Sequence, residues 1–365
     1  MRRIALGAAC FALLAAFAPE AGAHVVYDRT TLRQLAASSE LVLRVEIASP
    51  LRVWSAADGS DHQEYFSARV IEAVKGSSPG ATLDFFSHAE GEPRWRPKDQ
   101  ALVFLDRAAS RAEFAPLAER FPWFSIQGAG LEWSAPRGEE KEIVRAAHAW
   151  AELGPDAKIE RVRELVLKSL RSPSSALRAD ALSELVRVRE APGFFAKATD
   201  VRPFAALTAQ GPLSFPQRVA LVKLLESAPG FDAAARLRTL AQGPLPAADQ
   251  ATLIRVAGSV PDPKLSAWLA GLLAAPDATV RRDAVTALGR PWHAEHTPAV
   301  AAATADPDPA VARAAVRALG RIGSSGAQDA LEKIATSEGF LGVLAAAEVR
   351  TLSTPALAPS SAVAP

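Results

Sequence analysis

Residues 276–290 read PDATVRRDAVTALGR, and residues 307–321 repeat the same pattern as PDPAVARAAVRALGR. The two copies begin 31 residues apart, and weaker copies begin at Pro244, Pro212 and Pro173. Self-similarity at a period of roughly 20 to 50 residues is typical of solenoid proteins, in which each repeat buries its apolar face against its neighbours. The sequence therefore predicts an array of five helical repeats.

Each copy has the features of a helix with a defined start and end. Proline and a short polar residue begin a helix well, because proline has a suitable φ and the polar side chain accepts hydrogen bonds from unpaired N–H groups. The glycine after Leu288 or Leu319 is expected to end the helix. One apolar stripe is expected, which in the first copy contains Val280, Ala284, Val285 and Leu288. A second, alanine-rich helix is expected over residues 233–241, 264–275, 297–306 and 327–336.

The Pro-Asp opening, the apolar positions and the arginine after the glycine resemble HEAT repeats of the short bacterial kind, the set also seen in phycobilisome lyase relatives. The carrying apolar residues are Val280, Ala284 and Leu288 in one copy and Val311, Ala315 and Leu319 in the other. The resemblance covers residues 155–352. It implies an α-solenoid of helical hairpins whose surface binds another protein.

The N-terminus has the pattern of a secretory signal peptide. Arg2 and Arg3 precede an apolar run over residues 4–17, and Ala21-Gly22-Ala23 supplies small residues for cleavage. We therefore expect residues 1–23 to be removed and the protein to be exported to the periplasm or the exterior. The run is too short for a spanning helix, and no later apolar stretch reaches about 18 residues, so no membrane span is expected.

Composition narrows the choice of partner. The chain has 41 Lys and Arg against 40 Asp and Glu, and removal of Arg2, Arg3 and Glu20 leaves 39 of each. Nucleic acid is therefore not an expected partner, because there is no surplus of basic residues to displace its counterions. The leader would also take with it Cys10, the only cysteine, so no disulfide is expected.

Residues 24–137 have a different pattern from the repeats. Short runs rich in Val, Leu, Phe and Ile alternate with Gly, Pro, Asp and Ser, which predicts a small antiparallel β-barrel or sandwich. A helix over residues 28–38 is expected to lead into it. The predicted strands cover residues 39–47, 64–75, 81–87, 101–106 and 123–127.

The order SELVLRV at 39–45, FSARVIEAVKG at 66–76 and ALVFL at 101–105 resembles the netrin-like OB barrel, a family that includes the tissue inhibitors of metalloproteinases. The resemblance covers about 90 residues and implies a protease inhibitor or modulator. The cysteines with which inhibitors of that family present their N-terminus are absent here.

The predicted organisation is a mixed, two-domain protein with an OB-like β-barrel followed by an α-solenoid. A linker region at 138–154 contains a helix over residues 139–153, and residues 353–365, rich in Pro and Ala, are predicted to be disordered. The domain boundaries are 24–137 for the barrel and 155–352 for the solenoid.

Two short patterns match catalytic motifs but favour a structural interpretation. Gly76-Ser77-Ser78-Pro79-Gly80 matches the G-x-S-x-G nucleophile elbow, but Pro79 has no N–H for the oxyanion hole, and the segment joins two predicted strands. It is therefore expected to be a turn. His293 and His296 lie three residues apart in a predicted loop with no third ligand nearby, so a metal site is not expected there.

A copper site is an alternative. Cleavage after Ala23 would make His24 the first residue, and its amine and imidazole can bind copper when a second histidine joins, as in a histidine brace. His62 and His88, both in the β domain, are the candidates for that second ligand.

Aromatic residues recur just after a proline in three of the turns that join the two helices of a repeat. Phe194 and Phe195, Phe231, and Trp292 hold these positions. They can pack under the following helix as hydrophobic staples, or they can form an exposed ridge that binds a partner. Both alternatives remain open at this point.

The function that fits these observations is an exported binding or scaffold protein rather than an enzyme. The sequence has no nucleophile with its base, no phosphate-binding loop and no closed set of metal ligands, so no cofactor is expected. The alternatives are the netrin-like protease modulator and the copper protein.

Overall fold

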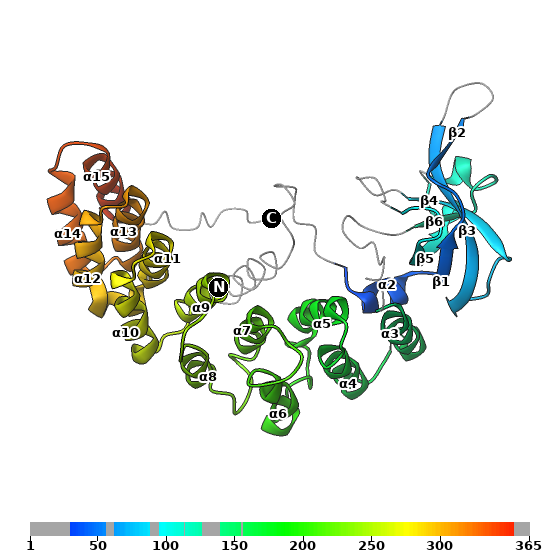
Figure 1. The fold of residues 1–365 in the computed structure, drawn as a ribbon, viewed down its shortest axis with the longest axis horizontal. Coiled ribbons are helices and arrows are strands. Elements are labelled where there is room, and N and C mark those ends of the chain that lie inside the picture. The colour runs from blue at the N-terminus through cyan, green and yellow to red at the C-terminus, as the bar shows by residue number, and fades with distance from the viewer. Residues whose placement is uncertain are drawn as a thin grey trace, which may run out of the picture. The chain divides into compact units, whose positions relative to one another are not determined.

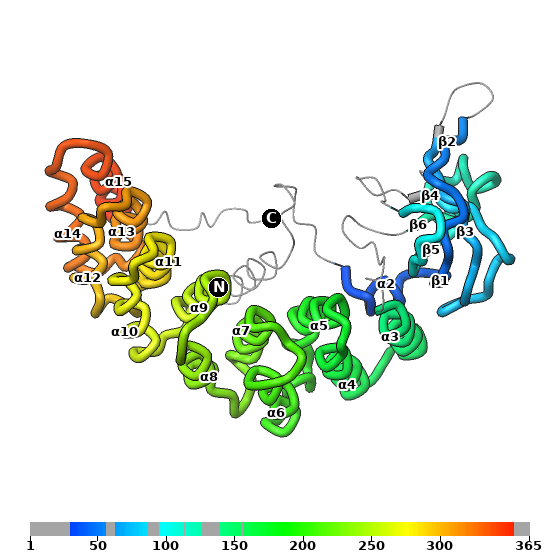
Figure 2. The backbone as a smooth tube through the Cα atoms, viewed as in Figure 1, coloured from blue at the N-terminus to red at the C-terminus, as the bar shows by residue number. Residues whose placement is uncertain are grey.

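The computed structural model describes residues 30–55, 62–87, 95–112, 114–125, 139–154 and 156–353. Contacts between Cα atoms divide the chain into two compact units, which meet in the sequence between Leu213 and Ser214. Figure 1 labels the elements of both units, and Figure 2 traces the same backbone. The predicted signal peptide and residues 354–365 lie outside the described residues.

The first unit contains a closed five-stranded barrel. Around it the order is β1-β5-β6-β4-β3, and pairing of β1 with β3 closes the ring. The pair β4–β6 is parallel and the other pairs are antiparallel. This connectivity makes the barrel OB-like, as predicted. The barrel strands are β1 (Leu41–Ile47), β3 (His62–Lys75), β4 (Thr82–Ser87), β5 (Gln100–Arg107) and β6 (Trp123–Ser125).

The barrel strands carry apolar residues on both faces. Phe85 and Trp123 point into the barrel core, whereas the next residues, Phe86 and Phe124, join a second cluster with Phe121. Alternation along a strand places successive side chains on opposite faces. The second cluster also contains Ala108 from η1 (Ala108–Ser110) and Leu117 from η2 (Ala115–Leu117). Residues 108–112 and 114–121 therefore cover one outer face of the barrel.

A sixth strand, β2 (Arg52–Ser55), was not predicted. It pairs antiparallel with the start of β3, and Arg52, Val53 and Ser55 are exposed. Because so little of it is buried, it lacks the alternating apolar pattern that marks the other strands.

Among the described residues, five helices complete the first unit. They are α2 (Leu32–Ser38), α3 (Glu140–Leu153), α4 (Ile159–Leu170), α5 (Ser175–Val188) and α6 (Ala198–Leu207). The predicted linker helix over 139–153 is thus α3. It packs on the barrel, where its His148 Nε2 lies 2.8 Å from Glu72 Oε1 of β3.

Helix α2 is held at both ends. Its first N–H, that of Leu32, donates to Asp180 of α5 at 2.9 Å, and the hydroxyl of Thr31 donates to Glu184 at 2.6 Å. At the other end, Lys75 Nζ of β3 donates to the carbonyl oxygens of Ala36 and Ser39 at 2.7 and 2.5 Å. A carboxylate at a helix N-terminus and an ammonium at its C-terminus both stabilise the helix dipole. Helix α2 therefore connects the barrel to the first repeat.

The second unit is an array of helical hairpins. Figure 1 shows α7, α9, α11 and α13 in one layer and α8, α10, α12 and α14 in the other. Helix α15 (Phe340–Ser353) packs on the last hairpin. The hairpin helices are α7 (Phe215–Leu224), α8 (Ala233–Leu240), α9 (Ala247–Ala257), α10 (Pro263–Gly271), α11 (Ala278–Leu288), α12 (Thr297–Ala302), α13 (Pro309–Ile322) and α14 (Ser325–Ala335), with short 3₁₀ turns η3 (Leu272–Ala274), η4 (Pro291–His296) and η5 (Ala303–Ala305).

The helix starts fix the register of the repeats. The N-cap residues of α5, α7, α9, α11 and α13 are Ser174, Ser214, Pro246, Asp277 and Asp308, which lie 40, 32, 31 and 31 residues apart. The sequence pattern put the copies at Pro212 and Pro244 one residue too early, because those two prolines were matched to Pro276. The predicted stripe is confirmed, since Val280, Ala284, Val285 and Leu288 are all buried.

One predicted helix end is wrong. Helix α11 ends at Gly289 as expected, but α13 continues through Gly320 to Ile322 and ends at Gly323, which has a left-handed φ of 63°. A Cβ on Gly258 would lie 2.8 Å from the carbonyl oxygen of Ala287, and one on Gly289 would lie 3.0 Å from the Cα of Ala318. The repeated glycine therefore allows consecutive helices of one layer to approach closely.

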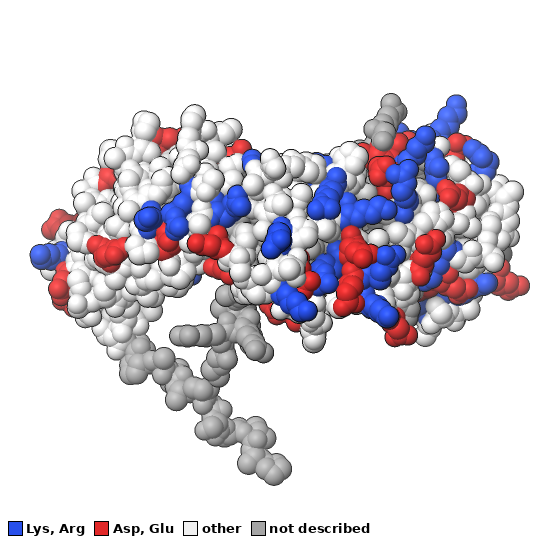
Figure 3. Space-filling model, turned by 90° about the horizontal axis from the view of Figure 1, so that it is seen from below, with Lys and Arg blue, Asp and Glu red and all other residues white. Residues whose placement is uncertain are grey.

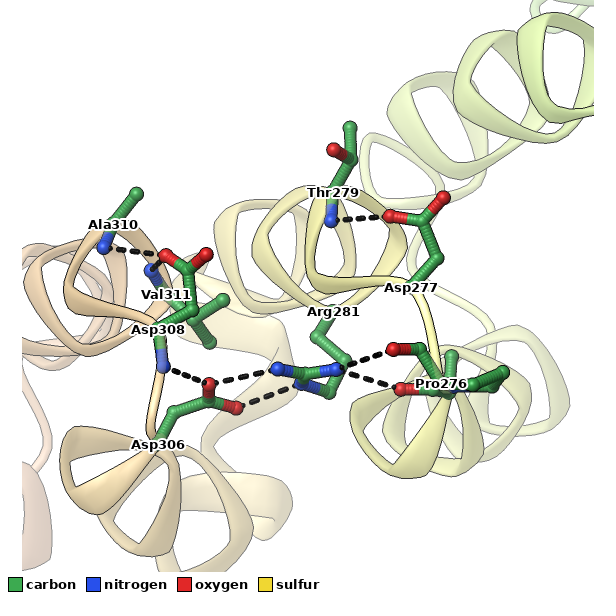
Figure 4. Close-up of polar contacts among 9 residues, drawn as sticks. Pro276, Asp277, Thr279, Arg281, Asp306, Asp308, Ala310 and Val311 are labelled. Carbon is green, nitrogen blue, oxygen red and sulfur yellow. Dashed lines mark hydrogen bonds and ion pairs between the residues drawn. The ribbon is translucent and has the colours of Figure 1, made fainter.

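An arginine joins neighbouring hairpins in this unit. Arg281 donates to both carboxylate oxygens of Asp306 at 2.8 and 2.9 Å, and also to the carbonyl oxygens of Ala275 and Pro276 (Figure 4). Asp306 in turn accepts a bond from the N–H of Asp308, the N-cap residue of α13. The hydrogen bond from Arg281 lowers the pKa of the Asp306 carboxyl below its usual range. This network fixes the start of α13 against the preceding hairpin.

Candidate interaction surface

The residues that matched a nucleophile elbow form a turn, as predicted. They connect β3 to β4, and Ser78 Oγ donates to the carbonyl oxygen of Gly80 at 2.7 Å. A nucleophilic serine needs a neighbouring base, and here the hydroxyl bonds within its own turn.

His293 is a buried structural residue. Its Nδ1 lies 2.7 Å from the hydroxyl of Ser266 in α10, and its Nε2 lies 3.2 Å from the carbonyl oxygen of Gly258 after α9. Since a carbonyl only accepts, Nε2 carries the proton and Nδ1 accepts from Ser266. Burial lowers the pKa of the His293 imidazole. The ring therefore ties one hairpin to the next and has no free nitrogen for a metal.

Among the described residues, no group of three or more His, Cys, Asp and Glu side chains is placed to hold a metal ion. His24 and His88, two of the proposed copper ligands, lie outside the described residues, as does the side chain of the third, His62. The histidine brace stays a prediction.

The aromatic residues of the first predicted turn pack inside the protein. Phe194 is fully buried, and its ring centroid lies 4.8 Å from that of Phe195 and 6.1 Å from that of Phe204 in α6. Phe195 is half-buried and also contacts Phe204, with 5.2 Å between the rings. Both rings thus pack against the following helix.

The other two aromatic residues differ from each other. Phe231 is half-buried. Trp292 is 44% exposed, and the guanidinium of Arg290 lies 6.0 Å from the centroid of its ring. Of the four residues singled out in the sequence, Trp292 is thus the one with the largest surface available to a partner.

A shallow depression of about 440 Å³ lies in the first unit between α3, α4 and the start of α5. The indole of Trp150 is among its lining residues, with charged side chains from both helices. Glu142 and Arg145 there form an ion pair at 2.6 Å, and Glu164 pairs with Arg161 at 2.5 Å. Both carboxylates that line the depression are thus ion-paired.

The exposed sides of α11 and α13 carry a feature that the sequence reasoning missed. Exposed residues recur every four positions at Arg282, Thr286 and Arg290 and, 31 residues later, at Arg313, Arg317 and Arg321. The helical period and the repeat period together could have identified this stripe before the structure, because positions four apart share one helix face.

Charged residues of both signs share the surface elsewhere. On the face shown in Figure 3, Lys and Arg side chains lie beside Asp and Glu side chains. Such mixing on this face differs from the wide basic face typical of nucleic-acid-binding proteins. In the part of the chain that the structure describes, each helix is too short or too polar to span a bilayer.

Comparison with known families agrees with the fold of the second unit. Residues 265–350 match the family model for HEAT repeats, which covers α10 to α15. No curated protein matches the chain. HEAT repeats are compatible with a protein-interaction scaffold, and the family is generally non-enzymatic.

Proposed function

We propose that this protein is an exported, non-enzymatic scaffold that binds another protein through its helical array. The observation that supports the proposal best is the repeated hairpin itself, which presents equivalent exposed positions at a constant spacing along α11 and α13. Arrays of this kind offer extended binding surfaces to partners. The signal-peptide pattern of residues 1–23 supports export to the periplasm or the exterior.

Several titratable side chains of the array form hydrogen bonds or ion pairs between hairpins, as expected of a scaffold. His293 and Asp306 each hydrogen-bond across hairpins, and Arg238 pairs with Asp262 at 2.5 Å. Side chains engaged in this way stabilise the stacking of hairpins. They leave neither a base nor a nucleophile poised for chemistry.

The test is capture of partners from an envelope extract by the purified, processed protein. A Trp292→Ser variant is the first comparison, because Trp292 is exposed, and aromatic residues contribute strongly to protein interfaces. We expect Trp292→Ser to keep the melting temperature of the wild type and to recover less partner. The matched control is Phe194→Ser, which should lower the melting temperature because Phe194 is buried.

Failure of the wild-type protein to enrich any envelope protein would contradict the scaffold proposal. Retention of an intact N-terminus from Met1 in exported protein would contradict the proposed processing, which predicts a mature chain that begins at His24.

A further inference from the structure

Five arginines lie on one side of two neighbouring helices. Arg282 and Arg290 lie on the exposed side of α11 and just after it, and Arg313, Arg317 and Arg321 lie on the exposed side of α13. Thr286 holds the sixth position of this two-by-three arrangement. We call the five arginines the arginine face.

The spacing of the arginine face follows from helix geometry. Residues four apart on a helix are separated by about 6 Å along its axis. Helices that pack side by side, as α11 and α13 do, have axes roughly 8 to 10 Å apart. The backbone positions that carry the five arginine side chains therefore span an area about 12 Å long and 10 Å wide.

Little of this positive charge is neutralised within the protein. Arg282 pairs with Asp283 at 3.1 Å. The other four members form no ion pair with a carboxylate in the described part of the chain, where Arg290 contacts Trp292 and Arg321 Nη2 donates to the carbonyl oxygen of Thr286 at 3.3 Å. By contrast, Arg281 of α11 donates through Nε and Nη2 to both carboxylate oxygens of Asp306.

Arg321 of α13 packs against the end of α11. Its guanidinium lies against Gly289, where a Cβ would come within 2.8 Å of Nη2. The part of this exposed side chain that packs against Gly289 is shielded from water, which lowers the pKa of Arg321. The like charges of Arg290 and Arg317 lower it further, and Glu348 opposes them. Neighbouring like charges favour the binding of an anion between them.

We propose that the arginine face binds an acidic segment of a partner protein, with Trp292 contacting the same segment at one edge. This inference rests on the proposed scaffold function and names the chemistry of its partner. Guanidinium groups bind carboxylates with two parallel hydrogen bonds. Alternate side chains of an extended segment lie about 6.5 to 7 Å apart, which matches the spacing of arginines along one helix.

A labelled peptide of twelve residues, with glutamate at every second position, provides the first test by fluorescence anisotropy. The wild-type chain should bind it more tightly than a peptide with glutamine at those positions. The double variant Arg313→Glu, Arg317→Glu should weaken binding by about tenfold or more, since both side chains are exposed and form no ion pair with a described residue. Binding should also weaken as salt rises.

The matched control is a double variant that changes the net charge by the same amount but lies in the layer of α10 and α14, away from the arginine face. Lys264 in α10 and Lys333 in α14 are exposed, so Lys264→Glu, Lys333→Glu should leave peptide affinity within about twofold of the wild type. Equal losses in the two double variants would overturn the inference, because net charge alone would then explain binding. Tighter binding of a twelve-nucleotide single strand than of the peptide would also overturn it.

The closing experiment separates this inference from the scaffold function. Envelope proteins captured by the wild type should be lost from the Arg313→Glu, Arg317→Glu variant and displaced by the glutamate peptide. If that variant captures them as well as the wild type does, the scaffold function stands and the arginine face is not its binding site. If the peptide binds through the arginine face but no envelope protein is captured, the inference stands and the scaffold proposal fails.

Discussion

The backbone N–H of Leu32 donates a 2.9 Å hydrogen bond to the carboxylate of Asp180, a residue 148 positions later in the chain. Glu184, one helical turn further along α5, accepts from the Thr31 hydroxyl and pairs with Arg33 at 2.8 Å. Both carboxylates are buried. The helix that leads into the barrel is thus capped by the first repeat, so the barrel and the start of the helical region form one compact unit.

The first prediction concerns this cap. Asp180→Ala leaves the N–H of Leu32 buried without its acceptor, and we expect a loss of about 1 to 3 kcal/mol in the free energy of unfolding. Asp180→Asn keeps an acceptor oxygen and should cost less. Urea unfolding measures the cost, and hydrogen exchange in α2 should rise in Asp180→Ala. The exposed Glu160 provides the control, and a loss no larger than that of Glu160→Ala would contradict the proposed role of the cap.

The second prediction is a pH dependence of stability that comes from His293. Burial lowers the pKa of this imidazole below its ordinary value of 6.5, so the folded state binds fewer protons than the unfolded state. Its contribution to stability is complete above pH 6.5 and is lost as the pH falls below that value. Urea midpoints followed by far-UV circular dichroism between pH 7.5 and pH 5 should show the decrease.

Two variants test whether His293 causes that pH dependence. His293→Gln should be less stable at neutral pH but should show a smaller decrease on acidification, because no buried imidazole remains to be protonated. His148→Gln, in the first unit, should keep the decrease of the wild type. An unchanged slope in His293→Gln would show that other groups cause the pH dependence.

The third prediction compares two glycines. Gly258→Ala should destabilise the array by about 1 to 3 kcal/mol, because its Cβ would overlap the backbone of Ala287. Gly271, the last residue of α10, has no atom within 4 Å of such a Cβ, so Gly271→Ala should stabilise by about 0.5 to 1 kcal/mol. Thermal melts give both shifts. Shifts of the same sign would mean that close helix approach does not determine the effect.

The features that were predictable from sequence depend on local patterns. The stripe Val280, Ala284 and Leu288 follows the helical period, and the N-cap at Asp277 follows from a short polar side chain before a helix. The strands β4 and β6 were predictable because both carry apolar residues toward the barrel core and toward its outer face. The exposed strand β2 lacks that pattern and was missed.

Other features depend on residues that meet only in the folded chain. Asp180 and Glu184 look like ordinary surface positions in the sequence of α5, and nothing local indicates that α2 covers them. Gly320 lies in the same Ala-Leu-Gly-Arg segment as Gly289, yet it stays within its helix. Ile322 stands where Pro291 follows Gly289, and Gly323 supplies the left-handed residue that ends α13. Of the candidate interface, Trp292 was identified from its turn. The arginine face was missed, although the helical period combined with the repeat period indicates it in the sequence.

The last prediction is the removal of one complete repeat. Deletion of residues 276–306 joins Ala275 to Pro307, so Asp308 replaces Asp277 as the N-cap of the next helix. Arg281 and Asp306 disappear together, which leaves neither partner of their ion pair behind. The close contact of Gly258 with Ala287 is replaced by an equivalent contact with Ala318, because Gly289 already packs on Ala318 in this way.

The shortened array should therefore fold, with less helix and a lower unfolding midpoint, since Ser324 replaces His293 in the register and cannot make its bonds to Ser266 and Gly258. Nearest-neighbour stacking predicts no change in the first unit. Hydrogen exchange should thus be unaltered in β1 and β5, where Val42, Leu43, Val103 and Phe104 are fully buried.

Deletion of residues 276–291 alone removes one helix of a hairpin, and this control should disrupt the array because the remaining helices lose their register. If the full-repeat deletion raises exchange in the barrel strands, the two units depend on each other for stability, contrary to this prediction.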